Sequence, residues 1–151
     1  MRRFGTFLIC CLLIVSILTI PVSAEEISTD QIISQTITYV TDDSYFIETI
    51  SIPSVELYAN SKTGTKTSVY VASGTSIFTL TVTGTFSYNG SSATATAATG
   101  SIATHVANAT VSNRYAYTSG ASACAFASVS YNGATLQKTV TLTCDKNGNL
   151  S

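Results

Sequence analysis

Charged side chains, proline and histidine are all scarce in this chain of 151 residues. Only 10% of the residues are charged, and seven Lys and Arg nearly balance eight Asp and Glu. This balance argues against a nucleic-acid-binding protein, which would carry a basic patch or stripe. A single His and four Cys argue against a zinc or iron site built from such ligands. We therefore expect no metal, no cofactor and no nucleic-acid partner.

The N-terminus has the organisation of an export signal. Arg2 and Arg3 precede an almost wholly apolar run, Phe7–Ile20, and Pro21 and the small residues up to Ala24 follow it. This order is typical of a secretory signal peptide. The run is shorter than the roughly 20 residues that a membrane-spanning helix needs. The sequence predicts that residues 1–24 are cleaved off and that the mature protein is secreted and no longer touches the membrane; a retained anchor is the alternative.

Cleavage would leave two cysteines, Cys124 and Cys144. Two cysteines in an exported chain most often form one disulfide. A two-residue turn at Asn132–Gly133 would place Cys124 opposite Thr141 and Cys144 out of reach. A turn of about three to five residues centred on Ala134 pairs the two cysteines instead. We predict this longer turn and a cross-strand disulfide, with a bond between two stacked sheets as the alternative.

The charges are segregated along the chain. Residues 25–56 hold seven acidic side chains and no basic one. Residues 57–144 hold Lys62, Lys66, Arg114 and Lys138 and no acidic one. We divide the mature chain into an acidic N-terminal segment, residues 25–44, and a β domain, residues 45–151. The acidic segment is either an arm that lies on a weakly basic body or a device for solubility.

The clearest strand signal lies at residues 79–88, where polar and apolar residues alternate. This pattern predicts a half-buried antiparallel strand. Gly84, in its middle, indicates a bulge or a close backbone approach. Asn89–Gly90 then predicts a hairpin turn, because both residues tolerate positive φ. The residues expected on the buried face are Leu80, Val82, Phe86 and Tyr88.

Weaker patterns predict further strands, at residues 45–52, 67–72, 107–117 and 121–131. We interpret Lys62–Lys66 as a turn, residues 91–100 as a loop or an edge strand, and residues 27–40 as either strand or helix. About six to eight short strands with frequent turns are typical of an antiparallel β-sandwich or a related barrel. The expected fold is therefore all-β.

Four segments carry a resemblance to a known group. They are Tyr45-Phe46-Ile47-Glu48-Thr49, Lys62-Thr63-Gly64-Thr65-Lys66-Thr67, the stretch from Val82 to Gly90, and the ending from Thr139 to Ser151. Together they resemble small secreted β-rich proteins of Gram-positive bacteria of the Firmicutes type, often from the gut. The resemblance covers most of residues 45–151. It implies export, a bacterial source and a β-rich fold, and it assigns no catalytic residue.

Few residues could support catalysis, and a few could support binding. His105 is the only imidazole, no Gly-x-Ser-x-Gly motif is present, and a serine triad would need an acid from the N-terminal segment. We therefore expect no enzymatic activity. Tyr115 and Tyr117 are two residues apart beside Arg114 and would share one strand face. An exposed pair could stack on sugar rings or anchor a protein partner, and ordinary sheet packing is the alternative.

These observations favour a secreted, non-enzymatic binding or interaction module. Its partner would be an extracellular protein or a glycan, and it would be released or loosely associated with the cell wall. The alternative is a secreted antagonist of the bacteriocin type that acts on other cells. No cationic amphipathic helix is visible, which argues against a membrane-lytic version of that alternative.

Overall fold

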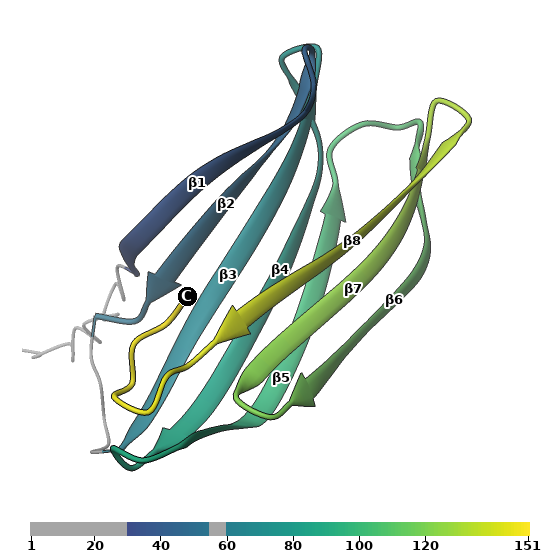
Figure 1. The fold of residues 1–151 in the computed structure, drawn as a ribbon. Helices are drawn as coiled ribbons and strands as arrows, with labels where there is room; N and C mark the ends of the chain where they lie inside the picture. The colour runs from purple at the N-terminus through teal and green to yellow at the C-terminus, as the bar shows by residue number, and fades with distance from the viewer. Residues whose placement is uncertain (1–29, 55–59) are drawn as a thin grey trace, which may run out of the picture.

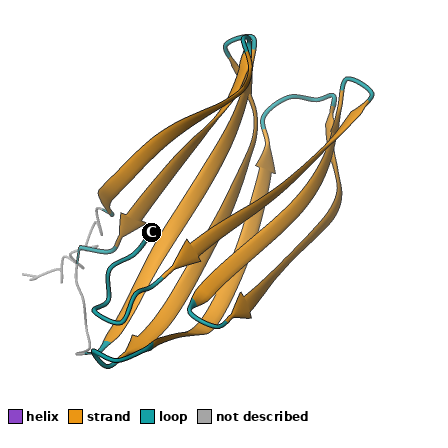
Figure 2. Ribbon diagram, in the orientation of Figure 1, coloured by secondary structure: helices purple, strands orange, loops and turns teal. Residues whose placement is uncertain are grey.

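The computed structural model describes residues 30–54 and 60–151. Within them the chain forms eight antiparallel strands in two sheets and no helix (Figures 1 and 2). The all-β prediction is confirmed. The five-stranded sheet A contains, in spatial order, β1 (Gln31–Thr41), β2 (Ser44–Ile52), β3 (Ser61–Ala72), β4 (Thr75–Tyr88) and β5 (Ala93–Thr104). The three-stranded sheet B contains β6 (Ala109–Ser119), β7 (Ser122–Tyr131) and β8 (Ala134–Thr143).

The two sheets pack face to face as a sandwich, and sheet B covers only part of sheet A. Strands β6, β7 and β8 contact β3, β4 and β5. Strand β2 reaches sheet B through side chains such as Ile50 in the core, and β1 extends sheet A further and forms its edge (Figure 1). The predicted signal peptide, residues 1–24, lies outside the described residues.

Alternating side chains of the central strands fill the core. The apolar face expected for β4 is buried as predicted, with Leu80, Val82 and Phe86 at 1% exposure or less. Strand β7 faces it with small residues, Ala123, Ala125 and Ala127, which let the two sheets approach closely. Gly84 lies at such a point, because a Cβ there would lie 2.6 Å from the Cβ of Ala123. The close approach predicted at Gly84 is therefore what the structure shows.

Three sequence segments differ from their expected structure or resolve an open choice. Residues 62–66 do not form a turn but continue β3, where their side chains alternate across the sheet. Residues 93–104 form β5, an edge strand of small residues. Residues 31–41, left open between strand and helix, form β1 and pair with β2. Sheet A thus includes part of the segment 25–44 that we separated from the β domain.

The predicted register of the last hairpin is wrong. Asn132 and Gly133 have positive φ, 49° and 78°, and form a two-residue turn that pairs Tyr131 with Ala134. Such turns are favoured because their twist matches that of the two strands. This register places Cys124 opposite Thr141.

The predicted disulfide is absent for the same reason. Cys124 and Cys144 are both free and buried. Cys124 lies on the outer face of sheet B, whereas Cys144 belongs to the core between the sheets. Cys144 follows the partner of Cys124 by three residues, which is about 10 Å along a strand and exceeds the reach of a disulfide.

Candidate functional site

Three aromatic rings pack against one another on the outer face of sheet B. Tyr115 and Tyr117 are two residues apart on β6 and therefore lie on the same face of the strand, as their spacing predicts. Both side chains point away from the core. The β6–β7 register places Phe126 opposite Tyr115. The rings of Tyr115 and Phe126 are stacked with centroids 4.9 Å apart, and those of Tyr115 and Tyr117 are 5.9 Å apart. We call these three residues the aromatic platform.

Both tyrosines of the platform are open to solvent. Tyr115 is 52% exposed and Tyr117 is 43% exposed. Among the described residues, the other large apolar side chains with high exposure all belong to β1. The two tyrosines therefore do not serve as core packing, and ring surface is left for a ligand.

A cleft borders the platform where β5 passes β6. Its volume is about 310 Å³, and it is lined by Leu80, Gly100–Ile102, Arg114–Ala116 and Phe126. Gly100 brings the backbone of β5 close to sheet B, since a Cβ there would lie 3.0 Å from the Cβ of Ala125. Arg114 is exposed and has no ion pair within residues 30–54 and 60–151. Its guanidinium is therefore available to a ligand in the cleft.

The structure brings together the three residues predicted for the site, and it adds others. Arg114 and Tyr115 line the cleft, and Tyr117 continues the platform beside it. Sequence reasoning missed Phe126, whose place follows only from the β6–β7 register. A two-residue turn at Gly120–Ala121, in which Gly120 has a φ of 56°, sets this register.

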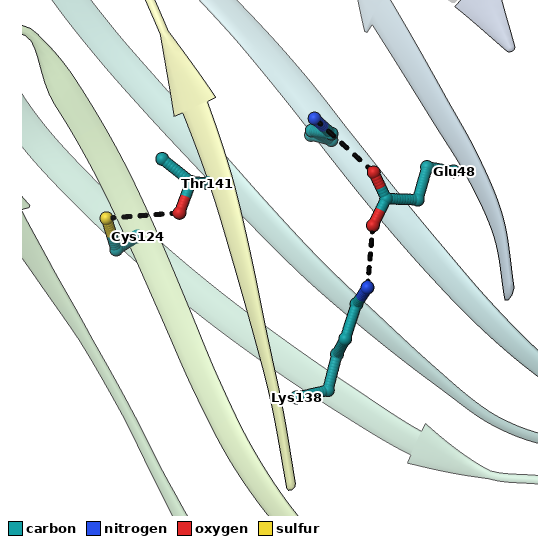
Figure 3. Close-up of polar contacts among 5 residues, drawn as sticks. Glu48, Cys124, Lys138 and Thr141 are labelled. Carbon is teal, nitrogen blue, oxygen red and sulfur yellow. Dashed lines mark hydrogen bonds and ion pairs between the residues drawn. The ribbon is translucent and has the colours of Figure 1, made fainter. Parts of the chain in front are cut away.

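Cys124 lies opposite Tyr117 on the neighbouring strand β7 and is free and buried rather than part of a disulfide. Its Sγ lies 3.6 Å from Thr141 Oγ1 on the neighbouring strand (Figure 3). A hydrogen bond with Cys124 raises the pKa of Tyr117 above its ordinary value, and the negative charge of the neighbouring thiolate would act in the same direction. The shift is away from physiological pH, where tyrosine is already neutral, so Tyr117 presents an uncharged ring.

A second polar group links the two sheets away from the platform. Glu48 on β2 accepts a hydrogen bond of 2.7 Å from Lys138 on β8 and pairs with Lys66 on β3 at 3.5 Å (Figure 3). The Lys138 Nζ also lies 4.2 Å from the centre of the Phe46 ring. Partial burial acts to raise the pKa of Glu48, but the hydrogen bond and charges of the two lysines outweigh it and lower the pKa. The acidic side chain of Glu48 is thus neutralised by the two basic side chains Lys66 and Lys138.

The residues weighed for catalysis or metal binding lie apart. His105 Nε2 makes a hydrogen bond of 2.7 Å with Thr79 Oγ1. In the part of the chain that the structure describes, no three His, Cys, Asp or Glu side chains lie close enough together to hold a metal ion. No helix among the same residues has the length and apolar character to cross a membrane.

The chain was compared with protein-family models, with curated proteins and with solved structures. None of the three comparisons gave a match. What the chain does is therefore inferred from the platform and the cleft.

Proposed function

We propose that the protein is a secreted, non-enzymatic module that binds a glycan of the bacterial cell wall through the aromatic platform. The observation that carries this proposal is the pair of exposed tyrosine rings, Tyr115 and Tyr117, beside a cleft lined by Arg114, which forms no ion pair with the described residues. The export signal predicted in residues 1–24 supports a place of action outside the cell.

The chemistry of the site suits a sugar. The apolar face of a sugar ring can pack on an aromatic ring, while the tyrosine hydroxyl remains free to form hydrogen bonds. Arg114 offers several N–H donors in a fixed plane to hydroxyl or carboxylate oxygens of the ligand. The cleft of about 310 Å³ has the size of the smaller ligand pockets of proteins, which begin at roughly 300 Å³.

The scaffold holds these groups in fixed positions. Tyr115 and Tyr117 project from one strand, and Phe126 projects from its hydrogen-bonded neighbour. Rigid aromatic side chains on strands lose little conformational entropy when a ligand binds. The platform is therefore arranged for binding before the ligand arrives.

Calorimetric titration with soluble wall glycan fragments tests the proposal. Tyr115→Ala and Tyr117→Ala should each weaken binding about tenfold, which corresponds to about 1.4 kcal/mol. Tyr39→Ala removes a tyrosine that is more exposed than either of these, at 71%, from β1 on the other sheet, and should leave the affinity for the fragments unchanged. Unchanged binding in the Tyr115→Ala and Tyr117→Ala variants, with their folds intact, would contradict the proposal.

A further inference from the structure

Strand β1 is an unprotected edge of sheet A. All eleven of its residues are exposed, although the strand is paired with β2 along its length. It lies at the edge of the sheet (Figure 1), so the row of backbone N–H and C=O groups on its outer side is paired by no other strand of residues 30–54 and 60–151. Such a row is a template for pairing with another strand.

The features that usually block an edge strand are missing from the middle of β1. The strand contains no Lys, no Pro and no charged residue of any kind. Its two irregularities lie near its ends, at Ile33 and Val40, so the stretch Gln35–Tyr39 is regular. The opposite edge, β5, differs, because β6 packs against it and the Ala95 N–H donates to the Gly120 carbonyl at 2.8 Å.

Apolar side chains are concentrated on the same strand. Five of the seven large hydrophobic side chains that are strongly exposed among the described residues belong to β1. Ile37 is 51% exposed and Tyr39 is 71% exposed, and both lie opposite apolar residues of β2, Ile47 and Tyr45. An apolar strip formed by Ile37, Tyr39 and their partners on β2 therefore lies along the free edge, on the outer face of sheet A.

We propose that β1 pairs antiparallel with β1 of a second copy of this chain, with the two Ile37 residues opposite one another. This centre uses the regular stretch of both copies. Thr36 then lies opposite Thr38 of the second copy, and Gln35 lies opposite its Tyr39. Pairs of β-branched residues and of threonines in directly opposed positions stabilise antiparallel sheets.

The charges of the chain favour a second copy as the occupant. With Ile37 at the centre, Asp42 and Asp43 fall beside Ile32 and Gln31 of the second copy, so no two acidic side chains lie opposite one another. Each copy pairs the free backbone groups of the other with the same strand, and such a self-complementary contact gives a closed two-fold dimer. The two sheets A join into one sheet of ten strands, which is within the usual limit for an open sheet.

The dimer would also orient the two proposed binding sites, although the dimer proposal does not depend on those sites. The two-fold axis is perpendicular to sheet A, so sheet B of both copies lies on the same side. Both aromatic platforms then face the same direction. If the proposed glycan binding holds, the dimer presents two sites to one surface.

Molar mass in solution gives the first test. The protein is expressed from the full chain and purified as the cells deliver it, and its mass is measured by light scattering after size exclusion. We expect twice the mass of one chain, and Ile37→Lys should halve it. The control Thr110→Lys places the same charge at an exposed position of β6 and should leave the mass doubled. A monomeric parent protein, or a dimer that Ile37→Lys leaves intact, would overturn the proposal.

Cysteine cross-linking tests the register. Directly opposite residues of antiparallel strands have Cα atoms about 4.5–5.5 Å apart, within the reach of a disulfide. Ile37→Cys should give covalent dimers on mild oxidation, with Cys10 and Cys11 replaced by Ser. The control Gln35→Cys should not, because the two introduced cysteines would be offset by four residues, or about 14 Å. The reverse result, or equal cross-linking of both variants, would overturn the proposed pairing.

Discussion

A methyl group added at Gly84 should strain the molecule where the two sheets come closest. The new Cβ would lie 2.6 Å from the Cβ of Ala123 and 2.7 Å from the Cζ of Phe86. Favourable carbon–carbon contacts are about 3.5–4.0 Å, so the sheets or the Phe86 ring would have to move by about 1 Å. Phe86 and Ala123 are fully buried, so neither has free space to move into.

The expected cost of Gly84→Ala follows from two opposing terms. Overpacking a well-filled core costs about 1–3 kcal/mol. Replacing Gly by Ala also restricts the unfolded chain, which stabilises the protein by about 0.4–1 kcal/mol. The free energy of unfolding should therefore fall by about 1–2 kcal/mol. Urea unfolding measures it as a lower midpoint with an unchanged slope, and the shift should be about 1 M.

A double-mutant cycle identifies the cause. Ala123→Gly removes the nearest clashing atom, so the combined variant should be more stable than the sum of the two single effects by at least about 0.5 kcal/mol. Two results would refute this reasoning: a Gly84→Ala variant as stable as the parent, or single effects that simply add.

Three further predictions concern the ion pairs, the cysteines and the last turn. Glu48→Gln should cost about 1–2 kcal/mol at neutral pH, since charge-assisted hydrogen bonds are worth about 1.5–3 kcal/mol and Glu48 is partly open to solvent. Because folding lowers the pKa of Glu48, this stabilisation is present above the unfolded pKa and is lost as the pH falls through the lower folded pKa. Thermal melts between pH 7 and pH 3 measure it, and a stability difference between parent and Glu48→Gln that stays the same throughout would contradict the prediction. Cys124 and Cys144 should both react with a thiol reagent only after unfolding, and an intact mass two hydrogens below the reduced value would show that they are bonded instead. Gly133→Ala should destabilise the protein by about 1 kcal/mol, because an L-residue is strained at its φ of 78°; an unchanged urea midpoint would speak against this turn geometry.

Alternation predicted the buried faces well because burial in a sandwich acts on single strands. The positions of Leu80, Val82 and Phe86 in the core required only the two-residue period of a strand. The same period placed Tyr115 and Tyr117 on one face. Features that depend on one strand alone were therefore accessible from the sequence.

Register was the weak point, because one turn decides it for a whole hairpin. The choice between a two-residue and a longer turn at Asn132–Gly133 changed the partner of Cys124 from Cys144 to Thr141. The expectation of a disulfide favoured the longer turn, whereas the positive φ that both turn residues tolerate favours the shorter one. Local backbone preference outweighed the assumed cross-link.

The rest of the site could not be predicted from the sequence because it depends on contacts between strands. Phe126 joins the platform through the β6–β7 register, and the cleft forms only where β5 of the other sheet passes β6. Composition also gave the wrong prediction for residues 62–66, because their Lys, Thr and Gly residues are typical of a turn. Cross-strand hydroxyl pairs such as Thr65–Thr83, with 3.1 Å between oxygens, hold this stretch within the sheet instead.

Co-sedimentation of the purified protein with isolated bacterial cell wall, and separately with living cells, tests the proposed function most directly. We expect the parent protein to sediment with isolated wall, the double variant Tyr115→Ala/Tyr117→Ala to remain in solution, and the control Thr110→Ala, at an exposed position of β6, to sediment like the parent. Viability of the living cells should not change. Sedimentation only with living cells that then lose viability would favour an antagonist, and equal sedimentation of all three proteins would show that the aromatic platform is not the binding site.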